Sequence, residues 1–225
     1  MTQLAAPSRN TLGVPTDIHD AIHTPAKPGR PMDASRDADI LDAALDILAE
    51  EGYEGMTIDM VAARAKAGKA TLYRRWPSKT ELVIDAVACM KHSDIDYNNL
   101  PDTGTLRGDM IAMMKSPTIN DAQKKIKIMA GLVTLLARNP EIADLARKVI
   151  VMPRVELNRF LMKRARDRGE VSADADIDTI SMVSVSMVSY KTLMMQEAVR
   201  REFMMDVLDS VVLPALGIAP VAPTA

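Results

Sequence analysis

The segment of residues 57–81, TIDMVAARAKAGKATLYRRWPSKTE, constrains the fold more than any other part of the chain. Its first residue, a threonine, can cap a short helix over 58–65. A break follows at 66–68, and a second short helix runs over 69–76 until Pro77 stops it. Two short helices joined by so tight a break have the length of a helix-turn-helix.

Helical periodicity extends over the remaining ordered sequence. Ile40, Ala44 and Leu48 recur at i, i+4 and i+8 in a helix that Gly52 can end. Aromatic residues make up only 3% of the chain, and the good helix formers Ala, Leu, Met, Lys, Arg and Glu are abundant. We predict an all-α protein of about nine helices, one opened by the S-x-x-E capping box at 78–81 and five over 105–116, 120–138, 140–168, 174–197 and 201–216.

Basic residues are concentrated in the helix-turn-helix segment. The net charge of the whole chain is −2, so overall charge gives no reason to expect nucleic-acid binding. Between Met60 and Thr80, however, no acidic residue occurs, and six basic residues do: Arg64, Lys66, Lys69, Arg74, Arg75 and Lys79. Such a cluster can neutralise DNA phosphates while one helix contacts base edges. Charge alone leaves a second interpretation open, a solvated basic face on a helical bundle.

The residues of this region resemble the helix-turn-helix of the tetracycline-repressor (TetR) family of bacterial regulators. The resemblance rests on GYEGMTIDMVAARAKAGKATLYRRWPSKTEL and the preceding apolar helix ILDAALDILAE, over roughly residues 34–94. Matching features include T-I-x-x-V-A, T-L-Y, the aromatic Trp76 and the following S-K. Beyond residue 94 the resemblance is one of architecture only. It implies a ligand-responsive repressor that binds a palindromic operator as a dimer and is released by a small molecule.

The resemblance also assigns roles to individual positions. It implies that Thr57, Tyr73 and Lys79 contact phosphates and that Leu72 and Trp76 pack inward. The full set of expected contacts to double-stranded DNA is Thr57, Lys69, Ala70, Thr71, Tyr73, Arg74 and Lys79.

The chain departs from the family pattern at the turn. Lys66 stands where the family usually has Gly, and Gly68 stands where Ser or Thr usually caps the recognition helix. A positive φ at Lys66 would carry a strain on the order of 1 kcal/mol. Gly68 is still an acceptable cap.

The predicted helix over 174–197 has no charged residue from Thr179 to Tyr190. A helix that is apolar or small on every face must be covered on all sides. Its own chain can cover one face, and in the TetR family the last two long helices pair with those of a second copy. We predict a homodimer through Ser181, Ser184, Val185, Val188, Val207 and Val211. A core helix within one chain is the alternative.

Methionine is unusually frequent, with 17 in the chain. Flexible thioethers suit adaptable binding surfaces as well as irregular cores. We predict a pocket for a small apolar or amphipathic effector lined by Met110, Met113, Met114, Met129 and Met182. Plain core packing is the alternative for part of this set.

Other classes of function have little support in the sequence. One cysteine and three histidines argue against a disulfide framework or a zinc finger, so we expect no metal site. His19 and His23 are four residues apart, but prolines flank them. We expect no enzyme and no cofactor, because catalytic and phosphate-binding motifs are missing. The remaining alternative is a helical adaptor that binds only protein.

These patterns divide the chain into four parts. Residues 1–33, with five prolines, are expected to form a disordered arm. Residues 34–94 are expected to form the DNA-binding domain, 95–217 the ligand-binding and dimerisation domain, and 218–225 a frayed tail. No secretory signal or membrane-spanning stretch is apparent, so we expect a cytoplasmic protein with no membrane partner.

Overall fold

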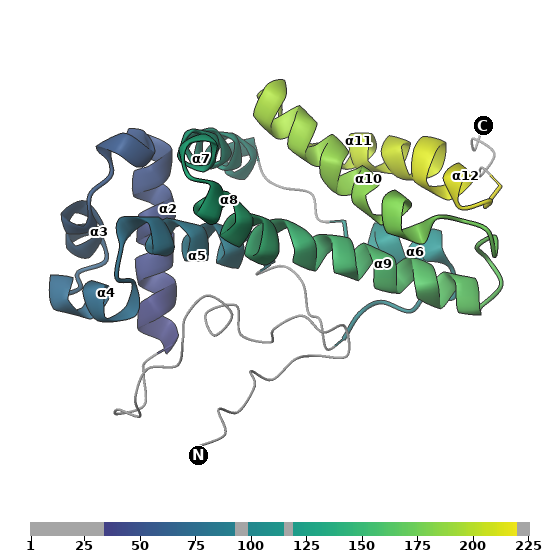
Figure 1. The fold of residues 1–225 in the computed structure, drawn as a ribbon, viewed down its shortest axis with the longest axis horizontal. Helices are drawn as coiled ribbons and strands as arrows, with labels where there is room; N and C mark the ends of the chain where they lie inside the picture. Colours follow the sequence, from purple (N-terminus) through teal and green to yellow (C-terminus); the bar gives the residue numbers. More distant parts are fainter. Residues whose placement is uncertain (1–33, 93–98, 115–118, 220–225) are drawn as a thin grey trace, which may run out of the picture. The chain divides into compact units, whose positions relative to one another are not determined.

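A computed structural model describes residues 34–92, 99–114 and 119–219 of the chain. The predicted arm (1–33) and all but two residues of the predicted tail (218–225) lie outside the described residues, as do His19 and His23. The described part contains no strand and nine continuous helical stretches, which confirms the all-α prediction (Figure 1). None of its helices is both long enough and apolar enough to cross a bilayer.

The described residues form two compact units. Of the described residues, unit 1 contains 34–92 and 127–150, and unit 2 contains 99–114, 119–126 and 151–219. Unit 1 therefore contains more than the predicted DNA-binding helices, since it takes in most of the helix expected over 120–138.

Unit 1 begins with four helices: α2 (Ala34–Gly55), α3 (Ile58–Arg64), α4 (Lys69–Arg75) and α5 (Lys79–His92). Helix α2 packs against α3 and α5. Gly52 has a φ of 68°, so the helix kinks there, and one further turn follows. The kink lies where the sequence predicts the helix to end, because glycine tolerates this left-handed conformation.

Two later segments complete the core of unit 1. They are the part of α7 (Ile119–Arg138) from residue 127 onward and α8 (Pro140–Ala146). Ile128 and Leu132 of α7 are buried in the same core as α2 and α5. A Cβ placed on Gly131 would lie 3.2 Å from Leu48 Cδ1, so the absence of a side chain permits this close packing.

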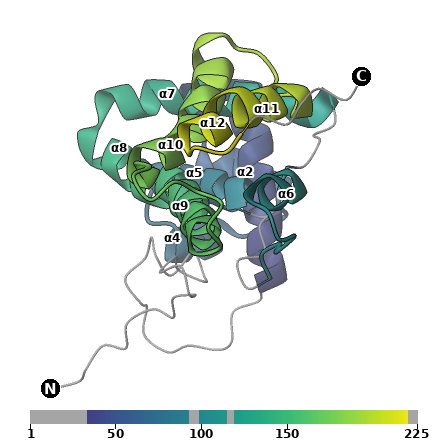
Figure 2. The same ribbon diagram turned by 90° about the vertical axis from the view of Figure 1, so that its right-hand side faces the viewer.

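Unit 2 consists of helices packed around a second core: α6 (Leu106–Ala112), α9 (Met152–Asp167), α10 (Ile177–Ser189), η2 (Tyr190–Met194), α11 (Arg201–Val207), η3 (Leu208–Val212) and α12 (Leu213–Ala215). Helix α9 packs against α6 and α10, and α10 packs against α11 and η3. In Figure 2, α9 is seen nearly end-on beneath α10. A π-helical turn, η1 (Arg147–Val151), precedes Pro153, which cannot donate a backbone hydrogen bond.

A buried carboxylate fixes α6 to α9 within unit 2. Asp109 is 0% exposed, and its Oδ1 accepts hydrogen bonds from the backbone N (2.6 Å) and hydroxyl (2.9 Å) of Thr103. Its Oδ2 accepts from Arg164 at 2.8 Å and Arg168 at 3.2 Å. Burial by itself raises the pKa of Asp109, but these hydrogen bonds and the Arg164 charge outweigh it, and the pKa lies below its ordinary value.

Candidate nucleic-acid interface and pocket

The turn between α3 and α4 has the conformation that the sequence suggests. Thr57 caps α3, and its Oγ1 accepts a hydrogen bond from the Met60 N–H at 3.2 Å. Lys66 has a φ of 50°, and its carbonyl accepts a hydrogen bond from Arg36 Nη2 at 3.1 Å. Gly68 is the N-cap of α4 and has extended backbone angles. The strained lysine is thus held by a contact from α2.

The inner face of α4 anchors the helix in the core of unit 1. Leu72 and Trp76 are both 0% exposed, which confirms that they pack inward. Trp76 Nε1 donates a hydrogen bond of 2.7 Å to Oδ2 of Asp85, which is itself buried. The buried indole N–H and the buried carboxylate each gain a hydrogen-bond partner in this way. The bond joins the C-terminal end of α4 to α5.

We expect the Trp76→Phe variant to lose about 2–3 kcal/mol of unfolding free energy. The variant removes the indole N–H and leaves the buried Asp85 carboxylate without this donor. Urea denaturation followed by circular dichroism measures the loss. Tyr73→Phe is the matched control, because the Tyr73 side chain is 52% exposed. Equal midpoints for the two variants would contradict the proposed anchoring role.

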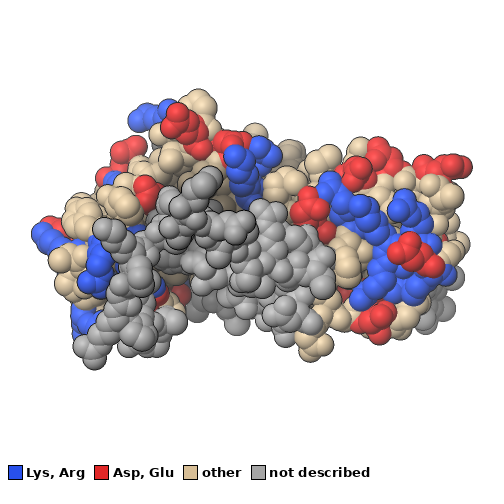
Figure 3. Space-filling model, turned by 60° about the horizontal axis from the view of Figure 1, so that its bottom comes forward, with Lys and Arg blue, Asp and Glu red and all other residues tan. Residues whose placement is uncertain are grey.

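The outer face of α4 is open to solvent. Ala70, Tyr73 and Arg74 are exposed, and Thr71 is half-buried. Figure 3 shows Lys and Arg side chains on the face of the molecule at the end where α3 and α4 lie. Lys69 is exposed as well, but its Nζ forms an ion pair of 2.5 Å with Asp59. A DNA phosphate would compete with this exposed carboxylate for the ammonium group.

Lys79 has a different position from the one expected of a free phosphate contact. Its Nζ donates hydrogen bonds to the carbonyls of Tyr53 (2.8 Å) and Met56 (3.0 Å), and it lies 4.3 Å from the centre of the Tyr53 ring. The Tyr53 hydroxyl lies 2.6 Å from the Thr80 hydroxyl oxygen. Lys79 therefore satisfies carbonyls at the end of α2, a structural role that sequence analysis missed.

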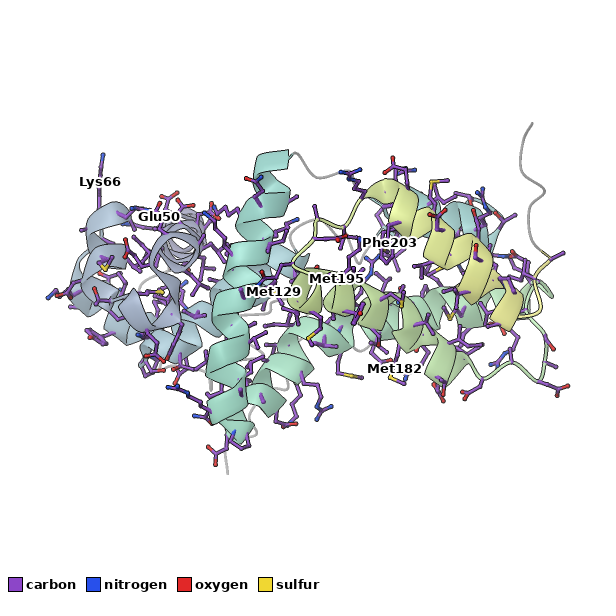
Figure 4. The ribbon with its side chains drawn as sticks, turned by 90° about the horizontal axis from the view of Figure 1, so that it is seen from above. Glu50, Lys66, Met129, Met182, Met195 and Phe203 are labelled. Atoms are coloured by element: carbon purple, nitrogen blue, oxygen red, sulfur yellow. The ribbon has the colours of Figure 1, made fainter. Side chains whose placement is uncertain are left out.

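Two further basic residues of the cluster also form ion pairs within unit 1. Arg64 binds both carboxylate oxygens of Glu50, at 2.7 and 2.8 Å. Arg75 forms an ion pair with Asp37, which joins α4 to the first turn of α2. Lys66 extends into solvent (Figure 4). Among the six basic residues, only the side chains of Lys66 and Arg74 have neither an ion pair nor a hydrogen bond within the part of the chain that the structure describes.

Unit 2 contains a pocket with an apolar lining and one polar side. Four methionines line it, namely Met110, Met113, Met114 and Met204, together with Leu161, Leu208 and Val212. The polar lining residues are Arg154, Asn158 and Ser184. The unfilled space is about 350 Å³, including the open mouth, but the enclosed part holds about one water molecule.

Two of the five methionines expected at the pocket lie elsewhere. Met110, Met113 and Met114 line it, as described above. Met129 belongs to unit 1 and packs against its core, and Met182 of α10 is 46% exposed (Figure 4). The pattern of methionines in the sequence therefore did not separate pocket residues from core and surface residues.

Part of the predicted dimer face lies inside unit 2. Ser181 and Val207 are 0% and 4% exposed, because they pack inside unit 2. Ser184 lines the pocket and faces Asn158 of α9. Val185 and Val188 are half-buried, and Val211 is 45% exposed. Val211 of the predicted set is therefore exposed, and the other exposed large apolar side chains of this region are Met182, Met187, Tyr190, Met194 and Met195.

The fold and these sites define a helix-turn-helix DNA-binding regulator with a separate helical unit that carries a pocket. A family model described as bacterial regulatory proteins of the tetR family matches residues 40–86. A second, described as the tetracyclin repressor-like C-terminal domain, matches residues 100–211. An HTH-type transcriptional regulator of Mycobacterium tuberculosis is 33% identical over 192 residues, which cover 83% of this chain and 93% of the relative.

Further comparisons agree with these matches. A DNA-binding transcriptional repressor TetR of Mycobacteroides abscessus is 31% identical over 158 residues, covering 70% of this chain and 82% of the relative. Among solved structures, a TetR-family regulator of Mesorhizobium loti has a TM-score of 0.62 at 16% identity and covers 85% of this chain and 100% of its own. The TetR-family regulator SCO0332 has a TM-score of 0.59 at 23% identity, with coverage of 84% and 100%. The chain belongs to the TetR family of transcriptional regulators.

Proposed function

We propose that this regulator is a repressor in which α4 contacts the operator, the exposed face of α10 joins two copies, and the pocket of unit 2 binds a small effector. The observation that carries the DNA-binding part is the division of α4 into two faces. Its inner face is fixed in the core by Leu72 and Trp76, and its outer face presents exposed Tyr73 and Arg74. A helix anchored in this way can enter the major groove without rearranging.

The dimer part of the proposal rests on exposed apolar area. Met182, Met187 and Tyr190 are 46%, 37% and 56% exposed on α10 and the start of η2, and Ser186 between them is exposed too. Contiguous apolar surface of this kind marks an interface in a soluble protein. A second copy is the proposed occupant because the chain belongs to the TetR family, whose members act as dimers.

We expect Arg74→Ala to weaken operator binding by about 5- to 100-fold and to relax sequence preference. Arg74 is exposed on α4 with no ion pair to a described residue, so it is available to bases and phosphates. Operator sequences would first be selected from random DNA with the full chain. Fluorescence anisotropy over a salt series then measures affinity for the selected site and for scrambled DNA.

The matched control is Arg166→Ala, an exposed arginine of α9 in unit 2. It should leave the affinity for both DNAs unchanged. Equal effects of the two substitutions would contradict a role for α4 in reading DNA. Binding to no DNA sequence at low salt would instead favour the alternative, an adaptor that binds only protein.

A further inference from the structure

The polar side of the unit 2 pocket is built around one buried amide. Asn158 of α9 is 1% exposed and lines the pocket. Its Nδ2 donates hydrogen bonds to the Ser181 carbonyl (2.9 Å) and to the Ser184 hydroxyl oxygen (3.0 Å). The Ser181 carbonyl can only accept, so the orientation of the amide is fixed and Nδ2 must point toward α10.

This arrangement leaves one acceptor and one donor for a pocket ligand. No described residue donates to Asn158 Oδ1. The Ser184 Oγ accepts from Nδ2, and no described residue accepts its hydroxyl proton. A nearly buried amide oxygen and a neighbouring hydroxyl proton therefore lie at one side of a pocket whose other walls are mainly methionine, leucine and valine.

We propose, building on the proposed effector function of this pocket, that the effector is an apolar molecule with one neutral hydroxyl group. The hydroxyl donates its proton to Asn158 Oδ1 and accepts the proton of Ser184. An ether or ketone cannot donate, and would leave Oδ1 unsatisfied when the pocket closes over it. A carboxylate would place a charge against the amide oxygen and would have to lose its hydration.

The pocket must open to admit such a molecule, and its lining permits this. The enclosed space holds about one water molecule. Met113, Met114 and Met204 are partly exposed at the pocket. Each thioether side chain has three rotatable bonds and can change rotamer without breaking a backbone hydrogen bond. The polar pair, in contrast, is held by two helices that pack on each other, so it selects the ligand while the methionines adapt to its shape.

The test uses three probes of nearly equal size with the full chain: n-octanol, heptyl methyl ether and octanoate. Isothermal titration calorimetry should show n-octanol binding about tenfold more tightly than the ether, since only the alcohol satisfies Oδ1. In Ser184→Ala both the alcohol and the ether should bind more weakly, because both oxygens lose the Ser184 proton, while the roughly tenfold preference for the alcohol should remain because Asn158 Oδ1 is still present. Ser172→Ala is the matched control: Ser172 is exposed, lies outside α10 and does not line the pocket, so this variant should bind all three probes as the unsubstituted protein does.

Three outcomes would overturn the proposal. Equal binding of alcohol and ether to the unsubstituted protein would show that Asn158 Oδ1 does not accept a hydrogen bond from the ligand. This comparison needs no variant, so it does not depend on whether a variant folds. Tighter binding of octanoate would assign recognition to an anion site at Arg154, which also lines the pocket. Binding of no probe would reject the hydroxyl site. Fluorescence anisotropy on the same samples measures binding to the selected operator. If the protein binds the operator but fails one of these ligand tests, the hydroxyl site is wrong while the DNA-binding function stands.

Discussion

Replacing Asp109 by Asn should destabilise unit 2 by about 3 kcal/mol at neutral pH. The carboxylate is fully buried between Thr103, Arg164 and Arg168, and both arginine side chains are mostly covered, at 20% and 24% exposure. Removing one charge from a buried pair leaves the other uncompensated, which typically costs 3–5 kcal/mol. The lower end applies because Arg168 also contacts Glu170 and Asp102. Urea denaturation followed by circular dichroism measures the change.

The pH dependence gives this prediction a sharper form. The pKa of Asp109 is lowered in the folded protein, so the stabilisation is present above the ordinary aspartate pKa and is lost as the pH falls below about 4. The stability difference between the unsubstituted protein and Asp109→Asn should therefore be constant near neutrality and shrink in acid. A difference that grew on acidification would contradict the assignment.

The matched control is Asp144→Asn. The pKa of Asp144 is also lowered, first by the hydrogen bond from Lys148 and then by that from Arg147, but its side chain is 45% exposed. Solvent screens such a pair, so this variant should keep the urea midpoint of the unsubstituted protein. Equal losses in Asp109→Asn and Asp144→Asn would mean that burial does not set the strength of the Asp109 network.

The sequence predicted the helix-turn-helix well because the signals for it are local. Thr57 as a cap, Gly68 as a cap and Pro77 after α4 each act within one or two turns of their own position. The inward packing of Leu72 and Trp76 also follows from helical spacing. Even the positive φ of Lys66 follows from its place in the turn.

Partners distant in sequence were not predictable in the same way. Lys79 counts as one more positive charge in the basic cluster, and only the fold places the carbonyls of Tyr53 and Met56 beside it. Asp109 likewise gave no signal, since Arg164 lies 55 residues away. A cluster of basic residues in a sequence therefore gives the candidates for DNA contacts. It does not show which of these side chains already bind groups of the protein itself.

The face of α10 was unpredictable for a different reason. Periodicity locates the buried side of a helix only when polar and apolar residues alternate, and residues 179–190 have no charge to mark the solvent side. Ser181 and Ser184 were therefore expected at an interface, yet they contact Asn158 inside unit 2. The packing of α9 fixes the phase of α10 and leaves Met182 and Met187 outward.

The outward position of Met182 and Met187 on α10 leads to a second prediction, on dimerisation and operator binding. The double variant Met182→Lys/Met187→Lys should be monomeric and should bind the selected operator at least about 100-fold more weakly. Two lysines on each copy would have to lose their hydration in the apolar contact, so the dimer should not form. A monomer engages one half-site and forgoes the gain of about 10²–10⁴ that comes from linking two binding events. Sedimentation velocity at micromolar concentration and anisotropy on the full operator measure the two effects.

Ala173→Lys/Asp174→Asn is the matched control, since both residues are exposed outside α10 and the pair of changes adds the same charge. Extra positive charge alone strengthens attraction to DNA, so this control should dimerise and bind at least as tightly as the unsubstituted protein. Weaker binding by the methionine variant would then come from lost dimerisation. If that variant stayed dimeric and kept its operator affinity, the interface would have to lie elsewhere on the chain. If it became monomeric but bound DNA unchanged, one copy of α4 would suffice, and the operator would need no two-fold symmetry.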